Sequence, residues 1–298
     1  MDVKELNHTD DFKVKPGKKI SLSNFSTTAR KKDLNKETNE ELVEKSIEEL
    51  ALMQDKLYAE NKHSILIVLQ AMDAAGKDGI VKHLMSGLNP TGVKVYSFKA
   101  PSSIELDHDY FWRHYSALPA RGEIAIFNRS HYENVLITKV HPEFILNETL
   151  PGINSVKDID KDFWESRYHQ ICRFEKNLTE NGTIILKFFL HISKEEQKKR
   201  FLERIDNPKK NWKFSVADLK ERNFWDDYQR AYETAISNTS TEEAPWFVIP
   251  ADDKWYSRLM ISTIIKNQFE KLNLSYPKVS SSTKDALLKA KDLLMKEK

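Results

Sequence analysis

The hydrophobic pattern of the chain alternates between short apolar runs and stretches in which apolar residues recur at helical spacing. Ser64–Gln70 is a continuous apolar run rich in branched residues, with the length of a strand that is buried on both faces. Further strands are predicted over 94–98, 123–127, 183–192 and 246–249. Between them the spacing predicts helices over 38–61, 77–88, 102–118, 163–181, 193–205, 215–236 and 256–272. Strands that alternate with helices favour an α/β fold, here a doubly wound parallel sheet with helices on both faces.

The organisation along the chain favours a single domain over residues 1–298, because no internal repeat and no low-complexity linker divides it. Residues 1 to about 36 are polar and predict an arm that either packs on the body or stays mobile. A helical excursion over about 193–236 interrupts the alternation of strands and helices. The basic amphipathic stretch at 285–298 predicts a surface helix or a contact between copies, and we expect a homo-oligomer.

Composition narrows the class of protein. Hydrophobic residues make up 40% and charged residues 31% of the 298 residues, a mix too apolar for a disordered chain and too charged for a membrane protein. The single cysteine, Cys172, excludes an internal disulfide, and the first residues lack a secretory signal, so we expect a cytoplasmic location. The 47 basic and 45 acidic residues nearly balance, which does not favour a nucleic-acid binder.

The sharpest local signal is the segment Ala71–Gly79, which follows the buried strand and opens a helix. A loop in this position binds phosphate, because backbone N–H groups and the helix N-terminus point at the anion. The segment departs from the usual pattern at Ala71, in place of the first glycine, and at Asp78, in place of the hydroxyl residue. Lys77 would add a positive charge, and Asp73 would replace the missing hydroxyl as a Mg²⁺ ligand. The alternative is a turn-forming Asp73 and a helix-surface Lys77.

A second group of polar residues follows the strand at 123–127, in the segment Asn128–Glu133. Ligands of open parallel sheets bind beyond the carboxyl ends of the strands, so this segment is expected near the phosphate loop. Arg129 can chelate phosphate oxygens with its planar fork, and Glu133 can hold Mg²⁺ directly or through water. For His131 we favour a hydrogen-bonded loop histidine over a metal ligand.

The helical excursion concentrates positive charge, at Lys198, Lys199, Arg200, Arg204, Lys209, Lys210 and Lys213. Arg200 and Arg204 are four residues apart and therefore share one helix face. A basic helical hairpin beside a phosphate site predicts a lid whose arginines close on the transferring group, while its lysines are expected to be solvated. In this topology one crevice suited to a linear phosphate chain would gather Lys77, Lys82, Lys99, Arg113, Arg129, Arg200 and Arg204.

Taken in order, these motifs resemble the polyphosphate kinase 2 family, the polyphosphate:nucleotide phosphotransferases, over roughly residues 40–272. The resemblance rests on the segments 72–79, 97–101, 127–133, 211–213 and 239–246. It implies a P-loop kinase core similar to thymidylate kinase, with a helical lid. It also implies transfer of the terminal phosphoryl group of inorganic polyphosphate to a nucleotide with Mg²⁺, converting AMP to ADP and ADP to ATP, with guanine nucleotides left open as acceptors.

The resemblance further assigns roles to individual residues. Asp73 matches the family's metal-binding carboxylate, Lys77 its phosphate-binding lysine, and Arg129 its phosphate-contacting arginine. Asn128 stands where many members have an aspartate, and the lid arginine is either Arg200 or Arg204. The complete prediction assigns catalysis to Asp73, Lys77, Arg129, Arg200 and Arg204. It assigns phosphate binding to Ala75, Gly76, Lys77, Asp78, Gly79, Lys82, Lys99, Arg113 and Arg129. Nucleotide binding is assigned to Asp73, Asn128, Arg129, Glu133 and Lys213, and metal binding to Asp73, Asn128 and Glu133.

The range of acceptors follows from the same resemblance. The segment Asn128–Glu133 is similar to the branch that phosphorylates nucleoside monophosphates as well as diphosphates, although Asn134 stands where an aspartate is often expected. Two other functions stay open from the residues alone. One is an NTP-dependent kinase of nucleotides or small metabolites, which the missing hydroxyl after Lys77 disfavours. The other is a non-catalytic binder of polyanions or nucleic acid, which Asp73 among phosphate-binding groups disfavours.

Overall fold

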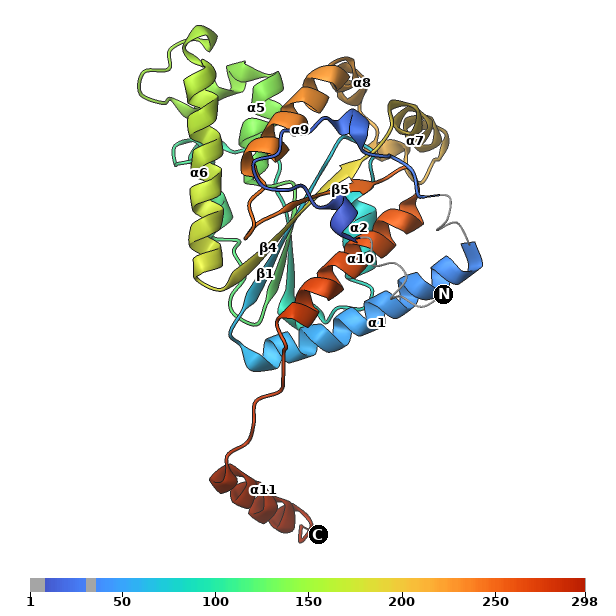
Figure 1. Ribbon diagram of the computed structural model, residues 1–298, viewed down its shortest axis with the longest axis vertical. Helices are drawn as coiled ribbons and strands as arrows, with labels where there is room; N and C mark the ends of the chain where they lie inside the picture. Colours follow the sequence, from blue (N-terminus) through green and yellow to red (C-terminus); the bar gives the residue numbers. More distant parts are fainter. Residues whose placement is uncertain (1–8, 31–35, 298) are drawn as a thin grey trace.

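The computed structural model describes residues 9–30 and 36–297, and its centre is one parallel sheet (Figure 1). The strands are β1 (Ser64–Ala71), β2 (Val93–Ser97), β3 (Ile124–Asn128), β4 (Thr183–His191) and β5 (Trp246–Pro250), and they lie in the order β2-β3-β1-β4-β5. Every neighbouring pair is parallel. All five predicted strands are present, and the α/β fold class is confirmed. The central strand β1 is buried along its whole length, as its continuous apolar run predicts.

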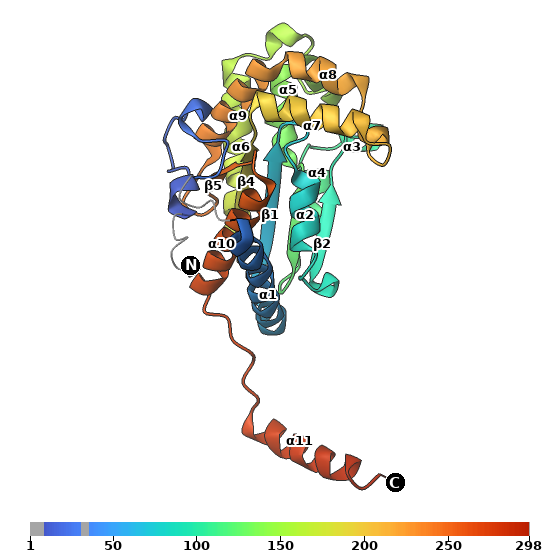
Figure 2. The same cartoon turned by 90° about the vertical axis from the view of Figure 1, so that its right-hand side faces the viewer.

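Helices cover both faces of this sheet (Figures 1 and 2). One face carries α1 (Lys36–Glu60), α2 (Lys77–Leu84) and α10 (Lys254–Lys271), and α10 contacts both of the others. The other face carries α5 (Ile137–Val140), α6 (Lys161–Glu180) and α9 (Trp225–Thr239). Short 3-10 helices fill the connections: η5 (Pro90–Gly92), η6 (His131–Val135), η7 (Pro142–Glu148) and η8 (Val156–Asp158).

Two predicted helices are each divided in the structure. The helix expected over 102–118 forms α3 (Ser103–Leu106) and α4 (Trp112–Tyr115), because Asp109 makes a turn in which its side-chain Oδ1 accepts from Phe111 N at 2.9 Å. The helix expected over 215–236 forms α8 (Val216–Asn223) and α9, which meet at Phe224. Helix α2 ends at Leu84 rather than 88, since the chain turns beneath α1 at Gly87, where a Cβ would lie 2.0 Å from Ile47 Cγ2.

The described part of the N-terminal arm, residues 9–30, packs on the body. It contains η2 (Thr9–Phe12) and η3 (Leu22–Asn24). Phe12, Val14 and Leu22 are buried, and Val14 N donates to Trp246 O at 2.8 Å, so the arm extends along β5. Of the two expectations for the arm, packing is the one the described residues support; residues 1–8 and 31–35 lie outside the described part.

The excursion over 193–236 divides into two parts. Helix α7 (Lys194–Asp206), η9 (Asn211–Lys213) and α8 lie beyond the carboxyl ends of the strands, at the top of Figure 2. Helix α9 instead packs into the body, where Trp225, Tyr232 and Ile236 are buried. The segment placed to act as a lid therefore ends near Phe224, earlier than the predicted 236, and its role as a lid stays a prediction.

The C-terminal helix α11 (Ser281–Leu294) extends away from the body in both views (Figures 1 and 2). Its leucines are exposed, including Leu287 and Leu294. A contact between copies through this helix, and a homo-oligomer, stay predictions. Among the described helices, none combines the length and the apolar character that a membrane span requires.

Candidate active site

The phosphate loop, residues 72–76, leaves β1 and enters α2 at the centre of the sheet. Its backbone turns through the left-handed region at Ala74 (φ 61°) and at Gly76 (φ 113°), the N-cap of α2. The conformation at Gly76 is one that residues with a Cβ rarely adopt, which explains the glycine there. The first turn of α2 thus points its unpaired N–H groups, with their partial positive charge, at the space above the loop.

That space is a trough of about 1120 Å³, here called the basic trough. It contains most of the residues predicted to bind phosphate. The segments at the carboxyl ends of β1, β2 and β3 and the excursion over 193–236 supply its lining. Its lining is Asp73, Ala74, Ala75, Gly76, Lys77, Asp78, Ser97, Phe98, Lys99, Asn128, Arg129, Arg204, Lys210, Trp212, Ser215 and Asp218. Three predicted phosphate ligands do not line it: Gly79, Lys82 and Arg113, the last of which lines a neighbouring cavity. Gly79 lies in the first turn of α2, where a Cβ would be 3.7 Å from Arg258 Nη2, and Lys82 is exposed one turn farther along the helix.

Asp73 and Arg129 meet in the basic trough although they are far apart in the sequence. Arg129 Nη2 lies 3.5 Å from Asp73 Oδ1, and both side chains are partly exposed. Arg129 has a positive φ of 64°, an uncommon conformation for a residue with a Cβ, which turns the chain sharply after β3. Burial alone would lower the pKa of Arg129, but the carboxylates of Glu133 and Asp73 raise it. Arg129 is therefore a permanent cation held beside the loop carboxylate.

Lys77 turns back over the phosphate loop. Its Nζ donates to Ala71 O at 2.9 Å, which keeps the ammonium at the mouth of β1. Desolvation lowers the pKa of Lys77, and the charge of Asp73 opposes part of that shift. An anion in the basic trough would replace this carbonyl as the partner of the ammonium and would favour its charged form.

The three predicted metal ligands are not brought together in one cavity. Asp73 and Asn128 line the basic trough, where Asn128 Nδ2 donates to Asp78 Oδ1 at 3.0 Å. Glu133 does not line the trough, but it shares a smaller cavity of about 200 Å³ with Asp73 and Arg129, and it also lines a second neighbouring cavity. Across residues 9–30 and 36–297, no three His, Cys, Asp or Glu side chains gather closely enough to hold a metal ion. Asp73 and Asn128 nevertheless fit Mg²⁺, which in such sites is bound by one or two carboxylates together with substrate phosphates.

An apolar cavity of about 300 Å³ adjoins the basic trough, and Arg129 and Lys99 border both. The accessible surface of its wall is mainly apolar, but the lining also includes many polar and charged residues, among them the carboxylates Glu105, Glu133 and Glu148. The side chains that line it include Phe98, Lys99, Leu106, Tyr110, Arg113, Arg129, Glu133, Asn134, Ile137, Thr138, Phe144 and Asn147. Arg113 faces this cavity rather than the trough, because its Nη2 donates to Lys99 O at 2.7 Å and its guanidinium lies over the Phe98 ring. A cavity of this size and character suits a flat, partly apolar ligand.

The two candidate lid arginines have different environments. Arg200 is 6% exposed and does not line the basic trough, because its guanidinium donates to backbone carbonyls beneath the phosphate loop. Arg204 lines the trough, with its Nη1 3.8 Å from Asp218 Oδ2. The structure therefore does not support Arg200 as a group that touches the transferring phosphate, and Arg204 is the one in position.

Sequence reasoning missed some residues of the site. Asp218 lines the basic trough. Its sequence context predicts only a capping box with Ser215 at the start of α8, so the sequence did not indicate a place in the site. Lys210 and Trp212 also line the trough, and Lys210 is exposed there, as expected for the lysines of this stretch. Lys213 lies on η9, and its side chain is outside the described part of the structure.

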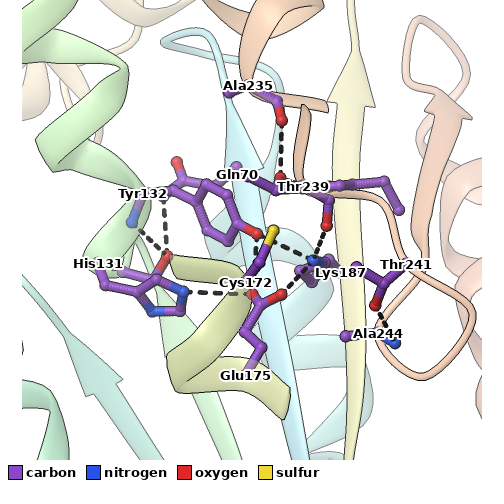
Figure 3. Close-up of polar contacts among 12 residues, drawn as sticks. Gln70, His131, Tyr132, Cys172, Glu175, Lys187, Ala235, Thr239, Thr241 and Ala244 are labelled. Atoms are coloured by element: carbon purple, nitrogen blue, oxygen red, sulfur yellow. Dashed lines mark hydrogen bonds and ion pairs between the residues drawn. The ribbon is translucent and has the colours of Figure 1, made fainter. Parts of the chain in front are cut away.

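Behind the segment 130–133 lies a buried charged cluster, shown in Figure 3: His131, Tyr132, Glu175 and Lys187. Glu175 Oε1 accepts from Tyr132 Oη at 2.8 Å and lies 3.3 Å from His131 Nε2. Lys187 Nζ lies 2.5 Å from Glu175 Oε2 and donates to Tyr132 Oη at 2.9 Å and to Thr239 O at 2.7 Å. His131 is thus a buried, hydrogen-bonded histidine, as favoured from the sequence. The cluster fixes the segment that follows Arg129.

Comparison with known proteins gives consistent results. The sequence profile of the family described as Polyphosphate kinase 2 matches residues 33–276. The chain is 48% identical over 288 residues to an ADP-polyphosphate phosphotransferase of Rhodopseudomonas palustris, covering 97% of this chain and 99% of the relative. It is 46% identical over 239 residues to an AMP/ADP-polyphosphate phosphotransferase of Meiothermus ruber, covering 80% and 84%. Among solved structures, a polyphosphate kinase 2 from Arthrobacter aurescens superimposes with a TM-score of 0.81 at 40% identity, covering 94% of this chain and 95% of that one.

Proposed function

The chain belongs to the polyphosphate kinase 2 family, and we propose that it transfers the terminal phosphoryl group of inorganic polyphosphate to AMP and to ADP. The observation that carries the proposal is the basic trough, where Asp73, Lys77 and Arg129 meet around the phosphate loop. Relatives that match nearly the whole chain or most of it are named for these substrates. The enzyme is accordingly a phosphotransferase.

The two adjoining cavities suggest how the substrates divide the site. The basic trough is large and open, and its lining has five cationic side chains against three aspartates, which suits a polyphosphate. The apolar cavity suits the nucleoside of the acceptor, with Arg129 and Lys99 at the border to receive its phosphates. In this arrangement the acceptor phosphate and the end of the polyphosphate meet beside Asp73.

Phosphoryl transfer in this site needs positioning and charge neutralisation more than covalent help from the protein. An oxygen of the acceptor phosphate forms a bond to the terminal phosphorus of polyphosphate, and the bond from that phosphorus to the next bridging oxygen breaks. The acceptor is already ionised, so no general base is required. Lys77 and Arg129 hold and neutralise the phosphates, and Arg204 does so from the side of α7. Mg²⁺, for which Asp73 and Asn128 are the proposed ligands, would supply further charge neutralisation when bound.

Phosphorus NMR of the enzyme with polyphosphate, AMP and Mg²⁺ tests the donor and the acceptor in one sample. We expect the resonances of ADP and then of ATP to appear as the polyphosphate shortens, and parallel samples with GMP show whether guanine nucleotides are accepted. If ATP phosphorylates AMP far faster than polyphosphate does, the chain is an NTP-dependent kinase. Binding of polyphosphate without any Mg²⁺-dependent turnover would instead indicate a non-catalytic binder.

Replacing Arg204 with methionine tests the proposed contact from α7. We expect kcat to fall roughly 100-fold, because a cation that neutralises the transferring phosphoryl group is lost while the aliphatic stem is kept. The matched control is Lys199→Met on the same helix, whose side chain is 65% exposed and lies outside the basic trough. Initial rates of ADP formation measure both. Equal rates for the two variants would show that Arg204 does not contribute to the reaction.

A further inference from the structure

Helix α7 holds three successive carbonyl groups of the phosphate loop. Gln197 Nε2 donates to Asp73 O at 3.0 Å, and Arg200 Nη1 donates to Ala74 O at 3.0 Å and to Ala75 O at 2.8 Å. The two side chains are one turn apart on α7 and are 2% and 6% exposed. They contact the carbonyl side of the loop, and neither lines the basic trough. Gln197 borders the smaller cavity that Asp73, Arg129 and Glu133 also line, where its amide is already used by Asp73 O and Arg222.

The guanidinium of Arg200 uses all five of its N–H groups. Besides the two bonds to the loop, Nη2 donates to Ala251 O at 2.7 Å and to Asp252 O at 2.8 Å, and Nε donates to Glu196 Oε1 at 2.8 Å. Ala251 and Asp252 follow β5, so one side chain joins the loop after β1 to the chain after β5. A side chain with no remaining donor cannot also bind a phosphate.

The direction of these carbonyls sets the direction of the loop's amides. In a trans peptide the N–H of each residue points opposite to the carbonyl before it. With the carbonyls of Asp73 and Ala75 turned toward α7, the N–H groups of Ala74 and Gly76 point away from it, toward the basic trough that these residues line. Ala74 holds a left-handed φ of 61°, a conformation that persists only where the surroundings enforce it. Arg200 and Gln197 supply that constraint.

The constraint extends to α8, because Arg222 Nη1 donates to Gln197 Oε1 at 2.6 Å. The amide of Gln197 is thereby oriented with its nitrogen toward Asp73 O and its oxygen toward Arg222. The N-terminus of α7 is also fixed, since Ser193 N donates to Asp252 Oδ1 at 2.8 Å. As far as Arg200, α7 is therefore a support joined to the body.

We propose that Arg200 and Gln197 are positioning residues, which hold the phosphate loop with its amides directed at the polyphosphate and do not touch substrate themselves. The proposal rests on the proposed function for the identity of the anion. Displacement of a preorganised donor by about 1 Å can reduce a rate about 100-fold, so the loss of this support should act on phosphate binding and transfer together. The nucleoside cavity, to which neither residue contributes, should be unaffected.

The test uses Arg200→Lys, Gln197→Leu and the control Lys198→Met, an exposed residue between them on α7. Lysine keeps the charge of Arg200 but cannot bond four carbonyls in a fork. Calorimetry measures the Kd for inorganic tripolyphosphate without nucleotide, steady-state kinetics give kcat and the KM for AMP, and thermal melting reports folding. For Arg200→Lys we expect a roughly tenfold weaker Kd, a kcat lowered about 100-fold and a KM for AMP within about twofold of wild type. Gln197→Leu should change the same quantities less, and Lys198→Met should change none of them.

Two results would overturn the proposal. One is an Arg200→Lys enzyme whose Kd and kcat stay near those of wild type. The other is an Arg200→Lys enzyme in which the KM for AMP rises as much as the Kd for tripolyphosphate and the melting temperature falls. That combination would indicate general unfolding. Because the Kd is measured without turnover, the comparison stands even if the wild-type enzyme uses another donor, in which case the proposed function alone fails.

Discussion

Asp73→Asn is expected to lower kcat at least about a thousandfold while leaving the free energy of unfolding within about 1 kcal/mol of wild type. The carboxylate lines a trough that we propose binds anions, where it would repel phosphate unless cations lie between them. Arg129, with Nη2 3.5 Å from Asp73 Oδ1, is one such cation. Asparagine keeps the shape but removes the charge that holds Arg129 and the proposed Mg²⁺. Stability should barely change, because a partly exposed ion pair contributes little to folding.

The matched control for this variant is Asp162→Asn, an exposed carboxylate in the first turn of α6. Both proteins are compared by initial rates over a range of Mg²⁺ concentrations and by thermal melting. For Asp73→Asn we also expect the Mg²⁺ concentration at half-maximal rate to rise. A kcat close to wild type would show that Asp73 takes no part in the reaction. A much lower melting temperature would show that its role is structural.

The architecture and the centre of the site followed from the sequence because they depend on periodicity. The apolar run at Ser64–Gln70 identifies a strand buried on both faces, and carboxyl ends of parallel strands meet at one edge of the sheet. That rule placed Arg129, at the end of β3, near Asp73, at the end of β1, although 56 positions separate them. The structure brings their side chains within 3.5 Å.

The sequence could not show which way individual side chains point within a helix or a short turn. Arg200 and Arg204 share a helix face, so spacing alone could not show that one lies beneath the phosphate loop and the other at the trough. Glu133 was expected with both Asp73 and Asn128, but it shares a cavity with Asp73 alone, because Glu133 lies on η6 and does not line the trough that Asn128 lines. Gln197 drew no attention because it is uncharged, and only the direction of its amide shows its contact with the loop.

The hydrophobic pattern of the sequence gave no indication of the buried charged cluster. Lys187 lies at the centre of the mainly apolar strand β4, and Glu175 lies among the buried residues of α6. Both side chains are almost fully inaccessible. Burial alone would raise the pKa of Glu175, but Lys187 and His131 lower it, so the carboxylate stays charged. A charged residue inside an apolar run is the signal that could have indicated such a pair.

Lys187→Met is expected to lower the free energy of unfolding by about 3–5 kcal/mol, because it leaves the Glu175 carboxylate buried without its counter-charge. The double variant Lys187→Met/Glu175→Gln should recover about 2 kcal/mol or more of that loss, since the glutamine oxygen can still accept from Tyr132 Oη and His131 Nε2 while no charge is buried. Recovery on adding a second substitution is the reverse of what two independent losses of packing would give.

Urea unfolding at pH 7, followed by circular dichroism, measures the two variants against wild type, with Lys176→Met as the control for an exposed lysine on α6. The control should unfold within about 0.5 kcal/mol of wild type. A double variant less stable than Lys187→Met would show that Glu175 contributes through its hydrogen bonds more than its unpaired charge costs. A single variant within about 1 kcal/mol of wild type would mean that water reaches the cluster, since only a solvated carboxylate tolerates the loss of its partner so well.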